Sequence, residues 1–230
     1  MTDKYIYVSN VKETGSAIIE VNENTGENRI IVMIGANLDL SPDEVRAAET
    51  EFASCKTVLM QLETNLDAAK AAIVLAKKYN KIVVFNPAPA QIVPDGLFYG
   101  VDYFTPNETE AEFYSGISVK TPADAFAAGR KLLGLGVKNV IVTLGKSGAA
   151  LINADTEVII PTTDLKPVDT TGAGDAFNGG LTVALSEGMN VIAAIKFANC
   201  VASISVTRKG SSLAMPARDE ADALFSKYYN

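Results

Sequence analysis

Short apolar runs alternate with amphipathic segments along most of this chain. Runs of consecutive apolar residues predict buried strands, and apolar positions three and four apart predict helices. We expect strands at 57–62, 81–85, 103–104 and 139–144, and helices at 67–79, 108–114, 122–133, 175–186, 191–206 and 219–228. This alternation indicates an α/β fold with a mainly parallel sheet flanked by helices.

Two further pairs of β-rich runs are each separated by a short polar stretch, which is typical of hairpins. One pair lies within residues 14–37, around a turn at 22–27, and the other at 149–152 and 157–160. The first hairpin stands outside the strand–helix alternation, so we expect it to form a small separate β element. The chain then divides into an N-terminal segment with little pattern at 1–13, the β element at 14–37 and an α/β core at 38–230.

Composition narrows the class of protein. The chain has 230 residues, a net charge of −7 and 48% hydrophobic residues, enough for one sizeable core. The acidic balance argues against partners such as nucleic acid or an anionic membrane surface. No apolar stretch is long enough to span a bilayer, and we expect a cytoplasmic protein. Cys55 and Cys200 are the only cysteines, and we expect both to be buried free thiols.

The sequence contains no histidine. This absence excludes Ser-His catalysis, histidine acid–base chemistry and His-ligated zinc. Any catalytic proton transfer must therefore rest on Asp, Glu, Lys or Tyr.

The segment from Asp169 to Phe177 carries the strongest chemical signal, Asp-Thr-Thr-Gly-Ala-Gly-Asp-Ala-Phe. Backbone N–H groups at a helix start are unpaired and can hold an anion, and Gly172 and Gly174 let a bulky anion approach them. Asp175 places a proton acceptor beside that site, as phosphoryl transfer to a hydroxyl requires. The structural alternative is a tight loop in which Asp175 only complements the helix dipole.

The segment Thr105-Pro106-Asn107-Glu108-Thr109-Glu110 predicts a helix start. Thr105 and Glu108 fit a capping box with Pro106 at the first helical position. That arrangement leaves Asn107 and Glu110 without a structural task, three residues apart on one helix face. Their amide and carboxylate could position hydrated Mg²⁺ and phosphate oxygens, or they could belong to a solvated acidic first turn.

Three loops carry weaker signals. Thr143-Leu144-Gly145-Lys146-Ser147-Gly148 follows a strand, and by itself it is an ordinary turn rather than a P-loop. Asn86 begins a proline-stiffened loop, Asn86-Pro87-Ala88-Pro89-Ala90, which could hold its side chain toward a cleft. Val206-Thr207-Arg208-Lys209-Gly210 follows a long helix, where the basic residues could simply complement the helix dipole.

Together these segments resemble the ribokinase family of carbohydrate kinases, which has the PfkB-type fold. The resemblance covers essentially the whole chain, and it rests on the order and spacing of the motifs at 86–90, 105–112, 169–177 and 206–210. It implies transfer of the γ-phosphoryl group of ATP to a primary hydroxyl of a pentose. The expected acceptor is D-ribose, which would give ribose 5-phosphate.

The resemblance also implies roles for individual residues. Asp175 would activate the sugar hydroxyl, Glu63 would lie near the sugar, and the backbone of Gly172, Ala173 and Gly174 would stabilise the transferring phosphoryl group. Glu110 would serve Mg²⁺ through water. The residues expected around ATP are Asn107, Thr143, Gly145, Gly148 and Asn199. Those expected around a monovalent cation, K⁺, several through backbone carbonyls, are Asp169, Thr171, Ser205, Arg208 and Gly210.

The chain also departs from the family pattern. Family members begin with a strand, an acidic residue that binds substrate and a Gly-Gly-Lys-Gly-Ala-Asn-type segment, none of which occurs here. We therefore expect most sugar-binding residues and the first βαβ portion to be absent, and residues 14–37 to be only the second half of a β lid. Ala214 also stands where some relatives place a hydroxyl near the cation.

This departure leaves several interpretations open. The chain is a fragment, or another chain supplies the absent segment, or a shortened protein has compensated, for example as a homodimer through the β lid. The leading hypothesis is an ATP-dependent pentose kinase. Whether this short chain is active by itself is left open. The alternatives are a kinase for another sugar or a nucleoside, and a non-catalytic nucleotide- or partner-binding remnant.

Overall fold

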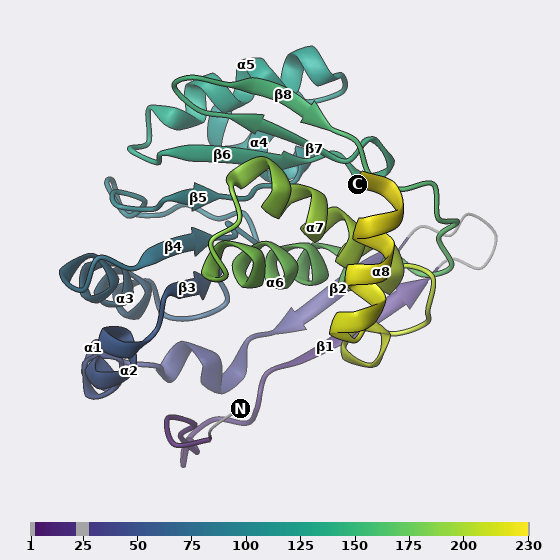
Figure 1. Cartoon of the computed structure of the whole chain (residues 1–230). Helices are drawn as coiled ribbons and strands as arrows, with labels where there is room; N and C mark the ends of the chain where they lie inside the picture. Colours follow the sequence, from purple (N-terminus) through teal and green to yellow (C-terminus); the bar gives the residue numbers. More distant parts are fainter. Residues whose placement is uncertain (1–2, 22–27, 230) are drawn as a thin grey trace.

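A six-stranded sheet with helices on both faces forms the body of the molecule, as Figure 1 shows for the computed structural model. The structure describes residues 3–21 and 28–229. Its strands follow one another across the sheet in chain order: β3 (Thr57–Met60), β4 (Ile82–Phe85), β5 (Tyr103–Phe104), β6 (Asn139–Thr143), β7 (Ala149–Ile152) and β8 (Glu157–Ile160). The pairs from β3 to β6 are parallel and those from β6 to β8 antiparallel, which confirms the predicted mainly parallel sheet and the second hairpin.

The helices form two layers. Those that cover one face of the sheet are α3 (Leu66–Lys78), α4 (Glu108–Ser115) and α5 (Pro122–Leu133). On the other side lie α6 (Ala173–Ser186) and α7 (Val191–Ser205), and α8 (Arg218–Tyr229) packs on α7. Shorter helical turns are η1 (Gly35–Asp39), α1 (Pro42–Ala47), α2 (Glu49–Ser54), η2 (Gly145–Ser147) and η3 (Ser212–Ala214). Among the described residues, no helix combines the length and the apolar character that crossing a bilayer demands.

Alternation along the strands explains the two cores. Val83 and Phe85 point into the core beneath α3, α4 and α5, while Val84 between them points into the core beneath α6 and α7. In β6, Val140 likewise points into the first of these cores and Ile141 into the second. Because successive strand residues face opposite sides, a sheet buried on both faces needs the continuous apolar runs seen in the sequence.

The element boundaries differ from the sequence predictions mainly at their ends. Helix α6 begins at Ala173, two residues earlier than predicted, because Gly172 adopts a left-handed conformation and serves as its N-cap. Strand β3 ends at Met60, and the chain then turns so that the Leu62 N–H donates to the Ala88 carbonyl. Cys200 is buried as predicted, but the prediction was wrong for Cys55, which is half-buried at the end of α2 beside the edge strand.

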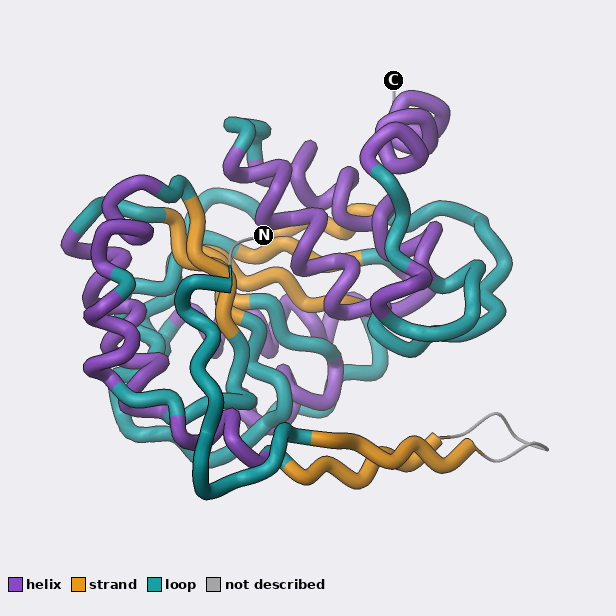
Figure 2. The backbone as a smooth tube through the Cα atoms, turned by 90° about the horizontal axis from the view of Figure 1, so that it is seen from below, coloured by secondary structure: helices purple, strands orange, loops and turns teal. Residues whose placement is uncertain are grey.

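The predicted early hairpin forms a separate two-stranded sheet. Strands β1 (Ser16–Val21) and β2 (Asn28–Met33) pair antiparallel, with Ile18 opposite Ile31. Figure 2 shows this ribbon extending away from the layered body. The turn predicted at 22–27 lies outside the described residues. That the ribbon acts as a lid, and that 14–37 and 38–230 are separate domains, stay predictions.

Candidate active site

The turn before α6 presents free backbone donors. Gly172 has φ +74°, which favours glycine, and this conformation turns the chain into the helix. The Ala173 N–H donates to the Thr170 carbonyl at 3.2 Å, and the Ala176 N–H to the Gly172 carbonyl at 2.9 Å. The N–H groups of Gly172, Gly174 and Asp175 have no acceptor among the described residues. This arrangement is a ready site for an anion at a helix N-terminus.

Asp175 lies in the first turn of α6, beside these donors. Its side chain is exposed at the rim of a pocket of about 500 Å³ between α6, α7 and α8. Partial desolvation raises the pKa of the Asp175 carboxyl above its ordinary value. A carboxylate with a raised pKa is a better proton acceptor, which suits a general base.

A hydrogen-bond chain fixes α6 at the carboxyl edge of the parallel strands. The Thr105 hydroxyl, directly after β5, donates to Asn178 Oδ1 at 2.7 Å. Asn178 Nδ2 donates in turn to the Gly174 carbonyl at 2.9 Å. Thr105 and Asn178 are both buried, so the site turn is held from beneath by paired polar groups.

Thr105 does not cap α4, contrary to the sequence prediction. Its N–H donates to the Phe85 carbonyl at 2.9 Å and so continues the ladder of the sheet. Its hydroxyl lies 3.3 Å from the same carbonyl and makes its shorter bond with Asn178 Oδ1 at 2.7 Å. The N-cap is Asn107, whose Oδ1 accepts from the Glu110 N–H at 2.8 Å, and Glu110 completes the capping box through the Asn107 N–H at 2.9 Å. The capping box predicted for Thr105 and Glu108 is therefore wrong, because Asn107 and Glu110 form the box instead, two residues further along the chain.

Glu110 combines a capping role with an unusual environment. Its side chain is buried, and desolvation raises the pKa of its carboxyl, although the hydrogen bonds from Asn107 work in the opposite direction. The carboxylate oxygens are hard ligands of the kind that Mg²⁺ or its waters prefer. The capping box alone explains both residues, so a metal role stays a prediction.

The residues predicted around ATP meet at the ends of β6 and β8. Asn107 forms a parallel bridge with Thr143, and Gly145 stands in open space with φ +49°. Gly148 lies so close to β8 that an added Cβ would sit 2.1 Å from the Ile160 carbonyl oxygen. Asn199 Nδ2 donates to the Ile160 and Pro161 carbonyls, both at 3.2 Å. The structure thus places these residues along the same edge of the sheet, where β6 and β8 end.

Asp169 joins the turn before α6 to the loop after α7. Its Oδ1 accepts the Thr171 N–H and its Oδ2 the Gly210 N–H, both at 2.9 Å. These bonds lower the pKa of the Asp169 carboxyl to about 2, and the bond from Gly210 has the largest effect. The carbonyls of Thr171, Arg208 and Gly210 accept no hydrogen bond within the described residues, and such oxygens suit a hard cation such as K⁺.

The neighbouring side chains limit how that cation could be held. The Arg208 guanidinium pairs with Glu220, so only the Arg208 backbone is available. The Ser205 hydroxyl donates to the Ala202 carbonyl at 2.8 Å, and Ala214 is fully buried without a polar side chain. Within the described ranges, no three His, Cys, Asp or Glu side chains cluster as a metal site. Any ligands of a cation at this place would therefore be mainly backbone oxygens.

Two of the predicted residues, Glu63 and Asn86, make no hydrogen bond or ion pair with Asp175. Glu63 is half-buried in the loop after β3. Asn86 Nδ2 donates to the Thr105 carbonyl at 2.8 Å, so it ties two strand ends together instead of facing a cleft. Sequence reasoning missed Asn178; an amide in the otherwise apolar face of α6, one turn after Asp175, was the available signal.

Comparison with known proteins agrees with the resemblance seen in the motifs. A family model described as pfkB family carbohydrate kinase matches residues 2–218. A ribokinase from Haemophilus influenzae is 42% identical over 207 residues, which are 90% of this chain and 67% of that protein. A deoxyribokinase from Salmonella typhi is 38% identical over 224 residues, 96% of this chain and 72% of that protein.

Solved structures give the same picture. The crystal structure of ribokinase from Thermotoga maritima matches with TM-score 0.82 and 41% identity, covering 94% of this chain and 70% of that one. The structure of Arabidopsis thaliana ribokinase complexed with ribose and ATP matches with TM-score 0.84 and 30% identity, at the same coverage.

Proposed function

The chain belongs to the pfkB family of carbohydrate kinases, and we propose that it transfers the γ-phosphoryl group of ATP to the primary hydroxyl of D-ribose. The observation that carries the proposal is the placement of Asp175 beside the free N–H groups of Gly172, Gly174 and Asp175 itself. A base and an anion site at one helix start are the two elements that this transfer needs.

Each part of the turn has a task in this reaction. Asp175 accepts the proton of the sugar hydroxyl as its oxygen attacks phosphorus. The free N–H groups stabilise negative charge on the transferring phosphoryl oxygens, and the Thr105–Asn178 pair keeps the turn in place. Mg²⁺, when bound, neutralises phosphate charge, and Glu110 would hold it through water.

The nucleotide and cation residues complete the proposal. Asn107, Thr143, Gly145, Gly148 and Asn199 would line the ATP site. Asp169 and the backbone carbonyls of Thr171, Arg208 and Gly210, with Ser205 at the end of α7, would hold K⁺ close to the anion site. Glu63 would contribute on the sugar side.

Substitution of the base tests the reaction. With ribose and ATP, Asp175→Asn should lower kcat by about 10²–10⁴-fold and leave ATP affinity nearly unchanged, because only the proton acceptor is lost. The matched control is Asp155→Asn, an exposed aspartate in the β7–β8 turn, which should keep the parent rate. Equal turnover of Asp175→Asn and parent would overturn the assignment of the base.

The deoxyribokinase relative supports 2-deoxyribose as a second candidate acceptor. Values of kcat/KM for ribose, 2-deoxyribose and a nucleoside decide between the acceptors. A site that hydrogen-bonds the 2-hydroxyl should favour ribose strongly, since the deoxy sugar leaves the partner group unpaired. ATP binding by calorimetry without phosphorylation of any of these alcohols, at high enzyme concentration, would favour a non-catalytic role.

Removal of the cation-site carboxylate tests the K⁺ proposal. Asp169→Asn replaces one carboxylate oxygen with an NH₂ group that cannot accept, so only one of the two bonds from Thr171 and Gly210 can persist and the negative charge is lost. The variant should need at least about tenfold more K⁺ for half-maximal activity, which corresponds to 1.4 kcal/mol. An unchanged K⁺ requirement would remove Asp169 from the cation site.

The exposed β ribbon supports a second copy of this chain as partner. Ile18, Ile31 and Met33 share one face and are 55%, 45% and 55% exposed, and a lone two-stranded sheet is marginally stable in water. We expect a homodimer through this ribbon. Light scattering should give the dimer mass for the parent and the monomer mass for Ile18→Asp/Ile31→Asp; a monomeric parent would refute the dimer.

A further inference from the structure

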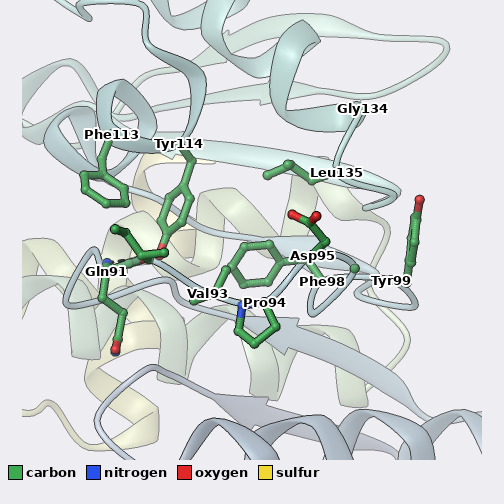
Figure 3. A pocket seen from close by; sticks show the side chains of 12 residues that line it. Gln91, Val93, Pro94, Asp95, Phe98, Tyr99, Phe113, Tyr114, Gly134 and Leu135 are labelled. Atoms are coloured by element: carbon green, nitrogen blue, oxygen red, sulfur yellow. Dashed lines mark hydrogen bonds between the residues drawn. The ribbon is translucent and has the colours of Figure 1, made fainter.

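A second pocket lies on the side of the sheet that α4 and α5 cover, opposite to α6. It has a volume of about 410 Å³ and is formed by the loop before β5, the end of α4 and the residues that follow α5 (Figure 3). Gly96 to Tyr99 precede β5, and Gly134 and Leu135 precede β6, so the pocket opens near the amino ends of the parallel strands. Asp175 belongs to the opposite, carboxyl edge.

Aromatic rings form much of this pocket, and hydrogen bonds hold one of them firmly. The Tyr114 hydroxyl donates to the Gln91 carbonyl at 2.9 Å and accepts the Gln91 N–H at 3.2 Å. Gln91 is itself fixed, because its Nε2 donates to the Leu62 carbonyl at 2.7 Å. Phe98 and Phe113 meet Tyr114 edge to face, with ring centroids 5.5 and 4.9 Å away. The walls are therefore formed before any ligand arrives.

Tyr99 forms the outer wall and rests on a glycine. At Gly136, which has φ +87°, an added Cβ would lie 2.0 Å from a ring carbon of Tyr99. Only glycine leaves room for the ring at this point. The Tyr99 side chain is nonetheless 66% exposed, and Phe113 is 49% exposed, so aromatic surface is offered to solvent.

Asp95 supplies the only charge among the residues that line the pocket. Its carboxylate makes no hydrogen bond or ion pair within the described residues. Figure 3 shows it directed toward Leu135, beside the ring of Phe98. The nearby Lys131 ammonium lies beside Gly116 at the end of α4 and is not part of the lining.

We propose that this pocket binds a small organic cation with an aromatic or aliphatic body. The faces of aromatic rings attract cations, and the unpaired carboxylate adds a direct charge partner at one side. The volume lies in the range of small-molecule sites. An anion would meet Asp95 and the negative ends of the dipoles of α4 and α5, which both end at the pocket.

Calorimetric titration with 2-phenylethylammonium chloride tests the site without any assay of activity. For a ligand of this size we expect a Kd of about 0.1–1 mM. The neutral analogue 2-phenylethanol has nearly the same shape and should bind at least about tenfold more weakly, because it lacks the charge. Equal binding of the alcohol, or no saturable binding of the ammonium, would overturn the proposal.

Two matched variants locate the binding. Asp95→Asn removes the charge from an exposed position and should weaken binding of the ammonium at least about tenfold. Glu112→Gln removes a charge that is also exposed but lies on α4 outside the lining, and it should leave the Kd unchanged. A Kd that Asp95→Asn does not change, or that both variants change equally, would contradict this site.

Discussion

The Thr105 hydroxyl donates to Asn178 Oδ1 at 2.7 Å across 73 positions of sequence. This bond joins the end of β5 to the first turns of α6, and thus the segment that carries Asn107 and Glu110 to the segment that carries Asp175. Because both side chains are buried, loss of one would leave the other without its partner and would destabilise the fold. It would also release the turn before α6 from the end of β5.

A double-mutant cycle measures this coupling. Thr105→Val leaves the buried Asn178 Oδ1 without its donor, and Asn178→Leu leaves the Thr105 hydroxyl only its longer contact with the Phe85 carbonyl. Each change should destabilise the fold by about 1–3 kcal/mol. The double variant should lose about 1 kcal/mol less than the two single losses added together, because it removes both members of the Thr105–Asn178 pair at once. Urea unfolding gives the values. Strict additivity would mean that the bond contributes nothing.

The two glycines of the turn should respond differently to alanine. Gly172→Ala forces a Cβ into a left-handed conformation and should cost about 1–2 kcal/mol of stability. Gly174 is helical and has open space around it, so Gly174→Ala should gain about 0.5–1 kcal/mol. Its methyl group would nevertheless stand beside the free N–H groups and should lower kcat by about 10²-fold.

Thermal unfolding and steady-state kinetics on the same preparations separate these effects. A Gly174→Ala protein that keeps both its stability and its turnover would show that no bulky anion approaches this turn.

Two glycines of the β6–β7 connection form another matched pair. Gly148 has φ +89° and lies against β8, so Gly148→Ala should cost at least about 3 kcal/mol and lower Tm by about 6–12 °C. Gly145 also has positive φ but nothing near it, and Gly145→Ala should cost only about 1 kcal/mol. Calorimetric Tm values test the order; equal losses would refute the close contact with β8.

Asp102 should make stability depend on pH. Burial would raise the pKa of its carboxyl, but Lys138, Lys77 and the Val83 N–H together lower it below the ordinary value. A folded-state pKa below the unfolded one means that the carboxylate stabilises the protein above about pH 4. This contribution is lost as the pH falls through the folded-state pKa.

Asp102→Asn should therefore lower stability at pH 7 by about 2 kcal/mol, or Tm by about 4–8 °C. The difference between variant and parent should shrink as the pH falls below about 4. Asp155→Asn is the control, because its exposed carboxylate makes no ion pair or hydrogen bond within the part of the chain that the structure describes. A difference that stays constant from pH 7 to pH 3 would contradict the assigned role of the ion pairs.

Much of the fold could be predicted from the sequence because its signals are local. Helix α5 and strands β7 and β8 have the predicted bounds, since periodicity, a Thr121 cap and Pro122 all act over a few residues. The cap of α4 could not be assigned in this way. Thr105 and Asn107 both fit a cap, and a buried partner 73 positions away, Asn178, draws Thr105 out of that role.

The sequence by itself determined the layer architecture, the family and the turn at Asp169 to Asp175, because strand and helix periods and glycine conformations are set by neighbours along the chain. Only the tertiary structure decided which N–H groups of that turn have no acceptor. It also decided that Asp169 accepts the Gly210 N–H and that Asn86 donates to the Thr105 carbonyl. These outcomes depend on which polar groups meet when two distant segments are buried together. No local pattern encodes that competition for partners.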